Sequence, residues 1–384
     1  MHLITATSDF VIKGRPYPGF PILLHDDMAD CAEANSFMRK YLLRGVIGSK
    51  KSWPSTGRAM YDYFSFLEAH GLDWKDVRRG EEHSLVGAYR DYCLDEIKLK
   101  RNTVRQRLIY VCALYQHALA QGWVDALPFG YEDRIGKRND GLLAHVDASG
   151  GKVAVRDVTP KKHRDLPKFL SKDEVKALLT ATENVHHRAM LRLALQTGLR
   201  LQEFSTFPLA YVLDAAGATG SSRNICIRLD PQDGHGIRTK GSKARDIYVS
   251  RALVRDLHQY AIHLRGERAS ASHEEHKTLF LNQDGLPFAA EGKQITRVVR
   301  SIGRRIGIKV HPHMLRHTYA THTLHAMQRS DSGIEPLVFL QRQLGHESIQ
   351  TTMIYLHLIN ERADEAVLAY DDELNDWLEG TEHG

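Results

Sequence analysis

The chain has 384 residues, of which 42% are hydrophobic, so it is long enough for two or three domains that each bury a core. Its formal net charge of +5 hides an asymmetry, because residues 361–384 hold nine acidic residues and one arginine, a net charge of −8. Residues 1–360 carry 51 basic and 38 acidic residues, and this net charge of +13 favours a polyanionic partner. An ordinary basic enzyme is the alternative.

The cysteine pattern and the hydropathy exclude several other classes. No stretch of 18 consecutive apolar residues occurs, and the N-terminal sequence does not resemble a secretion signal. The cysteines have neither the spacing of a zinc site nor that of a disulfide framework. They are Cys31, Cys93, Cys112 and Cys226. We therefore expect a cytoplasmic protein with reduced thiols and no membrane span.

The first part of the chain predicts a helical domain behind a short arm. Prolines and glycines in residues 1–27 predict an extended N-terminal arm. Residues 28–130 are predicted to be helical, because apolar residues recur at spacings of three to four. A stripe over 103–121 is flanked by basic residues, of which Arg101 and Arg105 are predicted to contact a DNA backbone. A basic face that contacts only solvent is the alternative.

Residues 131–168 lack periodicity and are predicted to be a basic linker. Residues 156–168 contain five Lys or Arg residues against two Asp residues, and Lys161 and Lys162 are predicted to contact DNA there.

Residues 169–360 predict a second domain that is mostly helical. Ser171 and Glu174 have capping-box spacing, and Gly198 suits the left-handed residue that ends a helix. Lys240 and Lys243 lie at the predicted tip of a hairpin. The predicted strands are 224–230, a short segment from Gly236 to Lys240, and 244–250. The predicted later helices are 251–265, 293–306, 313–327, 336–344 and 348–359. The fold class is thus mainly α with a small antiparallel β-sheet (α+β).

The second domain also contains polar residues whose chemistry suits a phosphodiester. Two guanidinium groups can hold two non-bridging oxygens with paired hydrogen bonds, and imidazoles and an amine can move protons. A phenol can attack phosphorus if a base takes its proton. The candidate catalytic residues are Arg200, Lys240, His313, Arg316, His346 and Tyr355.

At these residues the sequence resembles the tyrosine recombinase (phage integrase) family. The matching motifs, in family order, are TGLRLQE, TKGSKARDIYV, HMLRHTYATH, LGH, and a tyrosine nine residues after the histidine of LGH. The resemblance implies a two-domain clamp around double-stranded DNA, with residues 28–130 as the core-binding domain. It also implies a 3′-phosphotyrosyl intermediate, and four protomers acting on two specific sites with neither ATP nor a metal. No cofactor-binding or metal-binding residue is therefore predicted.

The chemistry of the side chains, together with the resemblance, predicts a role for each candidate residue. Tyr355 would be the nucleophile and His313 its base, while Lys240 would protonate the leaving 5′-oxygen. Glu203 would support the region around Arg200. Lys243 would contact a phosphate of the DNA. Arg200, Arg316 and His346 would bind the scissile phosphate.

Several alternatives stay open. A type IB topoisomerase shares this chemistry, and a non-cleaving accessory protein could share the fold. The pair His313 and His317 has i, i+4 spacing that could suit zinc. His317, His322 and His325 are expected to be structural or exposed rather than catalytic.

The C-terminal tail and one inserted segment have no assigned chemistry. The acidic tail, 361–384, is expected to contact a neighbouring protomer, with packing on its own chain as the alternative. Residues 329–336 are expected to form an extra loop near the site. Further expectations are integration, excision or transposition of a mobile element, a partner recombinase or accessory protein, and an association with the nucleoid.

Overall fold

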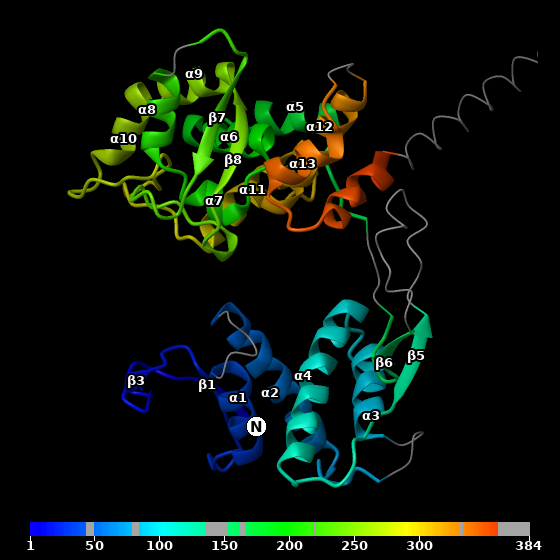
Figure 1. Ribbon diagram of the computed structural model, residues 1–384. Helices are drawn as coiled ribbons and strands as arrows, with labels where there is room; N and C mark the ends of the chain where they lie inside the picture. Colours follow the sequence, from blue (N-terminus) through cyan, green and yellow to red (C-terminus); the bar gives the residue numbers. More distant parts are fainter. Residues whose placement is uncertain are drawn as a thin grey trace, which may run out of the picture. The chain divides into compact units, whose positions relative to one another are not determined.

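The computed structural model describes residues 1–43, 50–78, 84–135, 152–161, 166–217, 220–329 and 333–359 (Figure 1). The chain divides into two compact units, Met1–Arg164 and Asp165–Gly384. The division falls inside the predicted linker. Among the helices of the described residues, none is long and apolar enough to cross a membrane.

The N-terminal residues are not a separate arm, which corrects the prediction for 1–27. Strand β1 (His2–Thr5) pairs antiparallel with β4 (Pro21–Leu24), and β2 (Val11–Ile12) pairs with β3 (Arg15–Pro16). Phe20 and Leu23 are buried in the core of the first unit. Pro21 is tolerated because it is the first residue of its strand. It lies so close to Gly57 that a Cβ there would come within 2.5 Å of the proline ring.

Four α-helices of the described residues form the body of the first unit, and they agree with the helical pattern predicted for 28–130, including the stripe over 103–121. Their core contains many buried aromatic side chains, and the hydroxyls of Tyr63 and Tyr115 are 2.6 Å apart. The helices are α1 (Ala32–Leu43), α2 (Trp53–Ala69), α3 (Leu85–Asp91) and α4 (Arg101–Ala120).

The linker prediction is wrong for part of its range. Strand β5 (Tyr131–Ile135) pairs antiparallel with β6 (Lys152–Arg156). The carboxylate of Asp157 accepts a hydrogen bond of 2.8 Å from the backbone N–H of Gly130, which fixes the base of this hairpin on the first unit. Five of the ten residues of β5 and β6 are charged at neutral pH, and three of them are consecutive in β5, so the sequence shows no clear alternation of apolar and polar residues there.

The second unit is mostly helical around one two-stranded sheet. Strand β7 (Asn224–Leu229) pairs antiparallel with β8 (Arg245–Ser250). The predicted third strand from Gly236 to Lys240 is absent from this described segment. Gly234 and Gly236 have positive φ there, and the N–H of Arg238 donates to the hydroxyl of Thr206 instead of to a strand.

The helices of the second unit agree with most of the predicted ranges. The capping box is confirmed, because the hydroxyl of Ser171 and the carboxylate of Glu174 accept each other's backbone N–H. The helices of the second unit are α5 (Lys172–Thr180), α6 (Val185–Thr197), α7 (Leu201–Ser205), α8 (Leu209–Gly217), α9 (Arg251–Gln259), α10 (Arg265–Ala269), α11 (Lys293–Arg305), α12 (Pro312–Gln328) and α13 (Pro336–Leu344), followed by a helix over 349–359.

The packing of these elements brings the ends of several helices together. Helices α8 and α9 contact the sheet on the left in Figure 1, whereas α13 contacts β8 and α12 on the right. Helix α12 also packs on α6. A small apolar cluster between α12, α13 and 349–359 includes Leu324, Leu344 and Tyr355. Arg200, Arg316 and His346 therefore lie where α6, α12 and α13 meet, and the helix over 349–359 brings Tyr355 to the same place.

Candidate active site

Arg200 is held in place by the turn between α6 and α7. Gly198 ends α6 with φ of 64°, and a Cβ there would come within 2.4 Å of the Tyr319 ring. The backbone N–H of Arg200 donates to Glu203 over 2.8 Å, and its guanidinium donates to Glu203 and to the carbonyl of Gly345. The guanidinium of Arg200 thus contacts the turn at Gly345, in the LGH motif (344–346), which we call the LGH turn.

Arg316 is buried, with only 2% of its surface exposed. Its Nη1 donates to the carbonyl of Gly198 over 2.7 Å and its Nη2 donates to the carbonyl of Leu344 over 2.6 Å. Both carbonyls lie at helix ends, where no intrahelical donor is available. Burial, and then the charge of Arg200, lowers the pKa of Arg316 to about 10, so the group stays cationic at neutral pH.

Tyr355 lies on the helix over 349–359 and is 2% exposed. Its hydroxyl is 3.0 Å from Nδ1 of His317. Its ring is nearly parallel to that of His346, with centroids 6.3 Å apart. Burial raises the pKa of Tyr355, while the charges of Arg316 and Arg200 act in the opposite direction. The phenol is therefore protonated at neutral pH.

The histidines of the site are neutral at pH 7. Burial, followed by nearby positive charge, lowers the pKa of both His317 and His346 to about 3. Desolvation and the charge of Arg316 also lower the pKa of His313, whose side chain is exposed. Nδ1 of His346 is 2.9 Å from the hydroxyl of Thr352. The positive charge of the site therefore comes from its arginines and lysines.

His317 is a site residue that sequence reasoning missed. The sequence predicted a structural or exposed role for it, yet its Nδ1 lies within hydrogen-bonding distance of the Tyr355 hydroxyl. His313, one helical turn away, has its ring 4.3 Å from the His317 ring. The signal was present as the i, i+4 spacing of the two histidines, which places both on one face of a helix.

The lysines lie at the tip between β7 and β8, as predicted. Lys240 begins a short 3-10 turn, Lys240–Ser242, and is exposed. Lys243 forms an ion pair of 2.9 Å with Glu347, which follows His346 directly. The hydrogen bond from Lys243 and the charge of Lys240 lower the pKa of Glu347. The tip therefore lies near the LGH turn.

Glu203 joins two arginines below the surface. Its side chain is 0% exposed and pairs with both Arg200 and Arg245. Nη2 of Arg245 lies 2.9 Å from the carboxylate. Arg245 was not singled out in the sequence. A Cβ on Gly345 would come within 2.6 Å of the Arg245 side chain, which explains the glycine of LGH.

The predicted DNA-contacting residues of the first unit lie at the start of α4 and just after β6. Arg101 and Lys161 are exposed. Arg105 is half-buried and donates to the carbonyl of Pro160 over 2.9 Å, so part of its guanidinium is engaged within the unit. Lys162, part of the 329–336 loop and the tail 361–384 lie outside the described residues.

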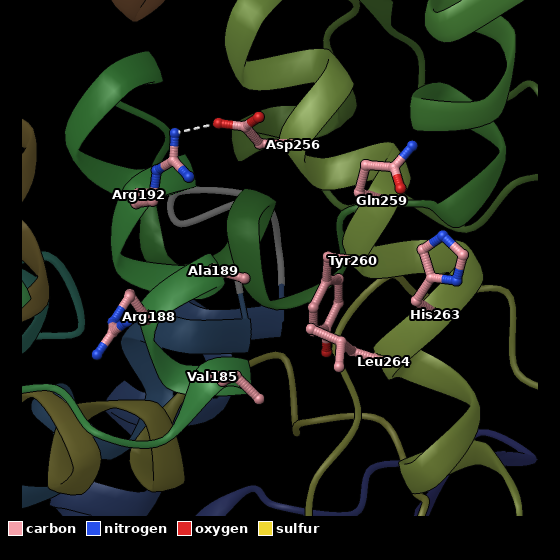
Figure 2. Close-up of a pocket in the computed structure, with 9 residues that line it drawn as sticks. All are labelled: Val185, Arg188, Ala189, Arg192, Asp256, Gln259, Tyr260, His263 and Leu264. Atoms are coloured by element: carbon pink, nitrogen blue, oxygen red, sulfur yellow. Dashed lines mark hydrogen bonds and ion pairs between the residues drawn. The ribbon is translucent and has the colours of Figure 1, made fainter.

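A hollow on another part of the second unit is lined by residues of α6 and of the segment that starts with α9. It has a volume of about 440 Å³ and lies between α6 and the segment from α9 onward (Figure 2). Figure 2 shows Arg192 paired with Asp256 across its edge. Its lining contains none of the candidate catalytic residues. Among the described residues, no group of three or more His, Cys, Asp or Glu side chains is arranged to hold a metal ion.

A sequence model of the phage integrase family matches residues 168–362, about half of the chain. The chain belongs to the phage integrase family. It is 28% identical over 306 residues to the tyrosine recombinase XerC of Pseudomonas putida, covering 76% of this chain and 91% of the relative. It is also 28% identical to XerA of Pyrococcus furiosus, covering 70% of this chain and 87% of the relative. The predicted enzyme class, a tyrosine site-specific recombinase, is confirmed.

Solved structures of recombinases have the same fold as this chain. XerH bound to difH DNA in a post-cleavage complex superposes with a TM-score of 0.56 at 17% identity, over 89% of this chain and 85% of XerH. The Tn1549 transposon integrase in complex with transposon right-end DNA superposes with a TM-score of 0.55 at 17% identity, over 88% of this chain and 99% of the integrase. The predicted fold class is confirmed.

Proposed function

We propose that the chain cleaves and rejoins DNA strands at specific sites through a 3′-phosphotyrosyl link to Tyr355. The observation that supports this most is the position of the Tyr355 hydroxyl, which is bonded to a histidine and lies within the electrostatic influence of Arg200 and Arg316. A neutral phenol beside two guanidinium groups suits attack on an anionic phosphodiester.

The proposed step is a transesterification. The Tyr355 oxygen forms a bond to phosphorus as the bond from phosphorus to the 5′-oxygen breaks. The phenol proton passes to His313, and Lys240 protonates the 5′-oxygen. Arg200, Arg316 and His346 bind the non-bridging oxygens, on which negative charge grows. The reverse reaction with the 5′-hydroxyl of a partner strand completes the exchange.

The covalent link can be located directly. Target duplexes are selected from a random-sequence pool and carry a nick just downstream of the scissile phosphate. They would trap the intermediate because the short fragment that bears the free 5′-hydroxyl diffuses away and cannot reverse the reaction. We expect a denaturation-resistant adduct, and mass spectrometry of its peptides should place the nucleotide on Tyr355. An adduct on another residue, or none on any selected duplex, would contradict the proposal.

The same experiment separates the alternatives from the recombinase. A non-cleaving accessory protein would bind the selected duplexes and form no adduct. A type IB topoisomerase would relax supercoiled plasmids that lack the selected site.

Lys240 should be the general acid for the leaving strand. Lys240→Ala should slow cleavage of ordinary DNA by a factor of order 10² or more. It should cleave DNA with a bridging 5′-sulfur almost as fast as the unchanged protein, because sulfur needs no proton to leave. Lys243→Ala is the matched control, and its smaller loss should not be rescued by sulfur. The reverse pattern, measured in single-turnover assays, would assign the role to Lys243.

We also propose how the enzyme assembles on DNA. The two units would close as a clamp around the duplex, with Arg101, Arg105, Lys161 and Lys162 on its backbone. Four protomers would act on two sites, with the acidic tail, 361–384, as a contact between them. A partner recombinase or accessory protein could complete the assembly, which would be associated with the nucleoid.

The biological setting has two candidates. One is integration, excision or transposition of a mobile element, and the similarity to a transposon integrase agrees with it. The other is site-specific recombination unconnected with a mobile element, which the relatives named as tyrosine recombinases XerC and XerA leave open. Inverted repeats next to the gene within a mobile element would support the first.

A further inference from the structure

One imidazole lies between the proposed nucleophile and its proposed base. His313 and His317 occupy successive turns of α12, and their rings meet at a centroid distance of 4.3 Å. Nδ1 of His317 is 3.0 Å from the Tyr355 hydroxyl, within ordinary hydrogen-bonding range. The role implied by family resemblance belongs to His313, and no role has been assigned to His317.

The surroundings of Tyr355 make this hydrogen bond consequential. Its side chain belongs to an apolar cluster in which Leu340 and Leu344 are fully buried. Burying a hydroxyl without a hydrogen-bond partner costs about 1–3 kcal/mol of stability. The hydrogen-bond partner of the Tyr355 hydroxyl therefore decides the direction in which its O–H bond points. The imidazole of His346 lies parallel to the phenol ring, and its Nδ1 faces Thr352.

The charge state of His317 decides what its Nδ1 can do. Burial, and then electrostatic repulsion from Arg316 and from the protonated form of His313, lowers the pKa of His317 to about 3. The imidazole is neutral at pH 7, so one ring nitrogen carries a lone pair. The phenol is protonated because burial raises its pKa. The two groups therefore form a hydrogen bond between neutral partners.

We propose that His317 is a positioning residue for the nucleophile, and that its Nδ1 accepts the hydrogen bond of the Tyr355 hydroxyl. This arrangement holds the hydroxyl hydrogen on the side of α12 in the DNA-free protein. In the cleavage step the hydrogen leaves Nδ1 of His317 and passes to His313, the proposed base on the same helix. It leaves the lone pairs of the phenol oxygen directed away from α12 for attack on phosphorus. The inference rests on the proposed function, because it specifies how the same tyrosine is oriented.

Three substitutions distinguish a hydrogen-bonding role from a packing role. In His317→Asn the amide nitrogen or oxygen falls near the position of Nδ1, whereas in His317→Gln it falls near Nε2. His317→Phe keeps a ring and removes both nitrogens. His325→Ala is the control, because His325 is an exposed histidine of the same helix.

Single-turnover adduct formation on the selected nicked duplex is the kinetic readout. We expect His317→Phe and His317→Gln to lose about 10- to 100-fold in the rate of the covalent step, the equivalent of one hydrogen bond. His317→Asn should retain most of the rate. The Kd for the duplex should be unchanged in all three, since His317 acts through Tyr355 and not on the DNA.

The outcomes separate this inference from the proposed function. If the unchanged protein forms no adduct, the proposed function fails. If it forms the adduct and His317→Phe is equally fast, the role of His317 is wrong. Equal losses in the Asn and Gln variants, accompanied by equal losses in Tm, would assign His317 to packing alone.

A second measurement needs no activity. In protein with ¹⁵N-labelled histidine, NMR should show His317 as the tautomer protonated on Nε2, with a lone pair on Nδ1. Tyr355→Phe should shift the Nδ1 resonance. A proton on Nδ1, or no response to Tyr355→Phe, would overturn the inference even if the Phe variant of His317 does not fold.

Discussion

Replacing Tyr355 with phenylalanine is expected to abolish the covalent adduct while leaving DNA binding intact. The substitution removes one oxygen and keeps the ring that packs against His346 in a largely apolar cluster. Removing a nucleophile reduces the rate of the chemical step by roughly 10⁴-fold or more. Gel electrophoresis under denaturing conditions measures the adduct, and fluorescence anisotropy measures the Kd for the duplex.

The second unit contains a matched control for this substitution. Tyr260 is also buried, and its hydroxyl is 3.1 Å from Nδ1 of His186. Tyr260→Phe therefore removes the same kind of hydrogen bond and should lower stability to a similar extent, yet its adduct should form at the unchanged rate. An adduct that persists in Tyr355→Phe would place the nucleophile elsewhere.

Glu203→Ala is expected to cause the largest loss of stability. The carboxylate is fully buried between Arg200 and Arg245, so its removal leaves two partly buried guanidinium groups without a counter-charge. Breaking a buried pair in this way costs about 3–5 kcal/mol. Chemical denaturation should show the loss. Glu347→Ala is the control, because the pair between Glu347 and Lys243 is exposed and should contribute little.

The Glu203 contribution should also depend on pH. Burial raises the pKa of Glu203, but hydrogen bonds and charge from Arg245 outweigh burial and hold it below the ordinary value of 4.5. Because the folded-state pKa is the lower one, the stabilisation is present above pH 4.5 and declines as the pH falls through the folded-state value. The difference in the free energy of unfolding between the unchanged protein and the Glu203→Gln variant should therefore become smaller as the pH is lowered. A constant difference would contradict this assignment.

The sequence predicted local features of the site better than its long-range contacts. Gly198 and the helix that starts after Arg200 follow from backbone preferences that a few neighbouring residues determine. The pairing of Arg245 with Glu203 joins residues 42 positions apart, and the bond from Arg316 to Gly198 joins residues 118 positions apart. Periodicity identifies the buried face of an element, but it does not identify the distant carbonyl that a side chain reaches.

The first unit shows the same limit. Prolines near the N-terminus correctly indicated non-helical backbone, but they gave no sign that Leu23 and Phe20 enter a core built mainly by α2 and α4. Strands β5 and β6 escaped prediction because their pairing is non-local and their residues lack a clean apolar alternation.

The hydrogen bonds from Arg316 to two backbone carbonyls affect how its guanidinium would bind a phosphate of the DNA. A free arginine side chain has about 2 kcal/mol of rotamer entropy to lose when it is ordered. In Arg316 both Nη atoms are already bonded to the ends of α6 and α13, so this ordering occurs as the chain folds. Arriving DNA would meet a guanidinium of fixed direction, and its binding free energy would not be reduced by the loss of that side chain's freedom.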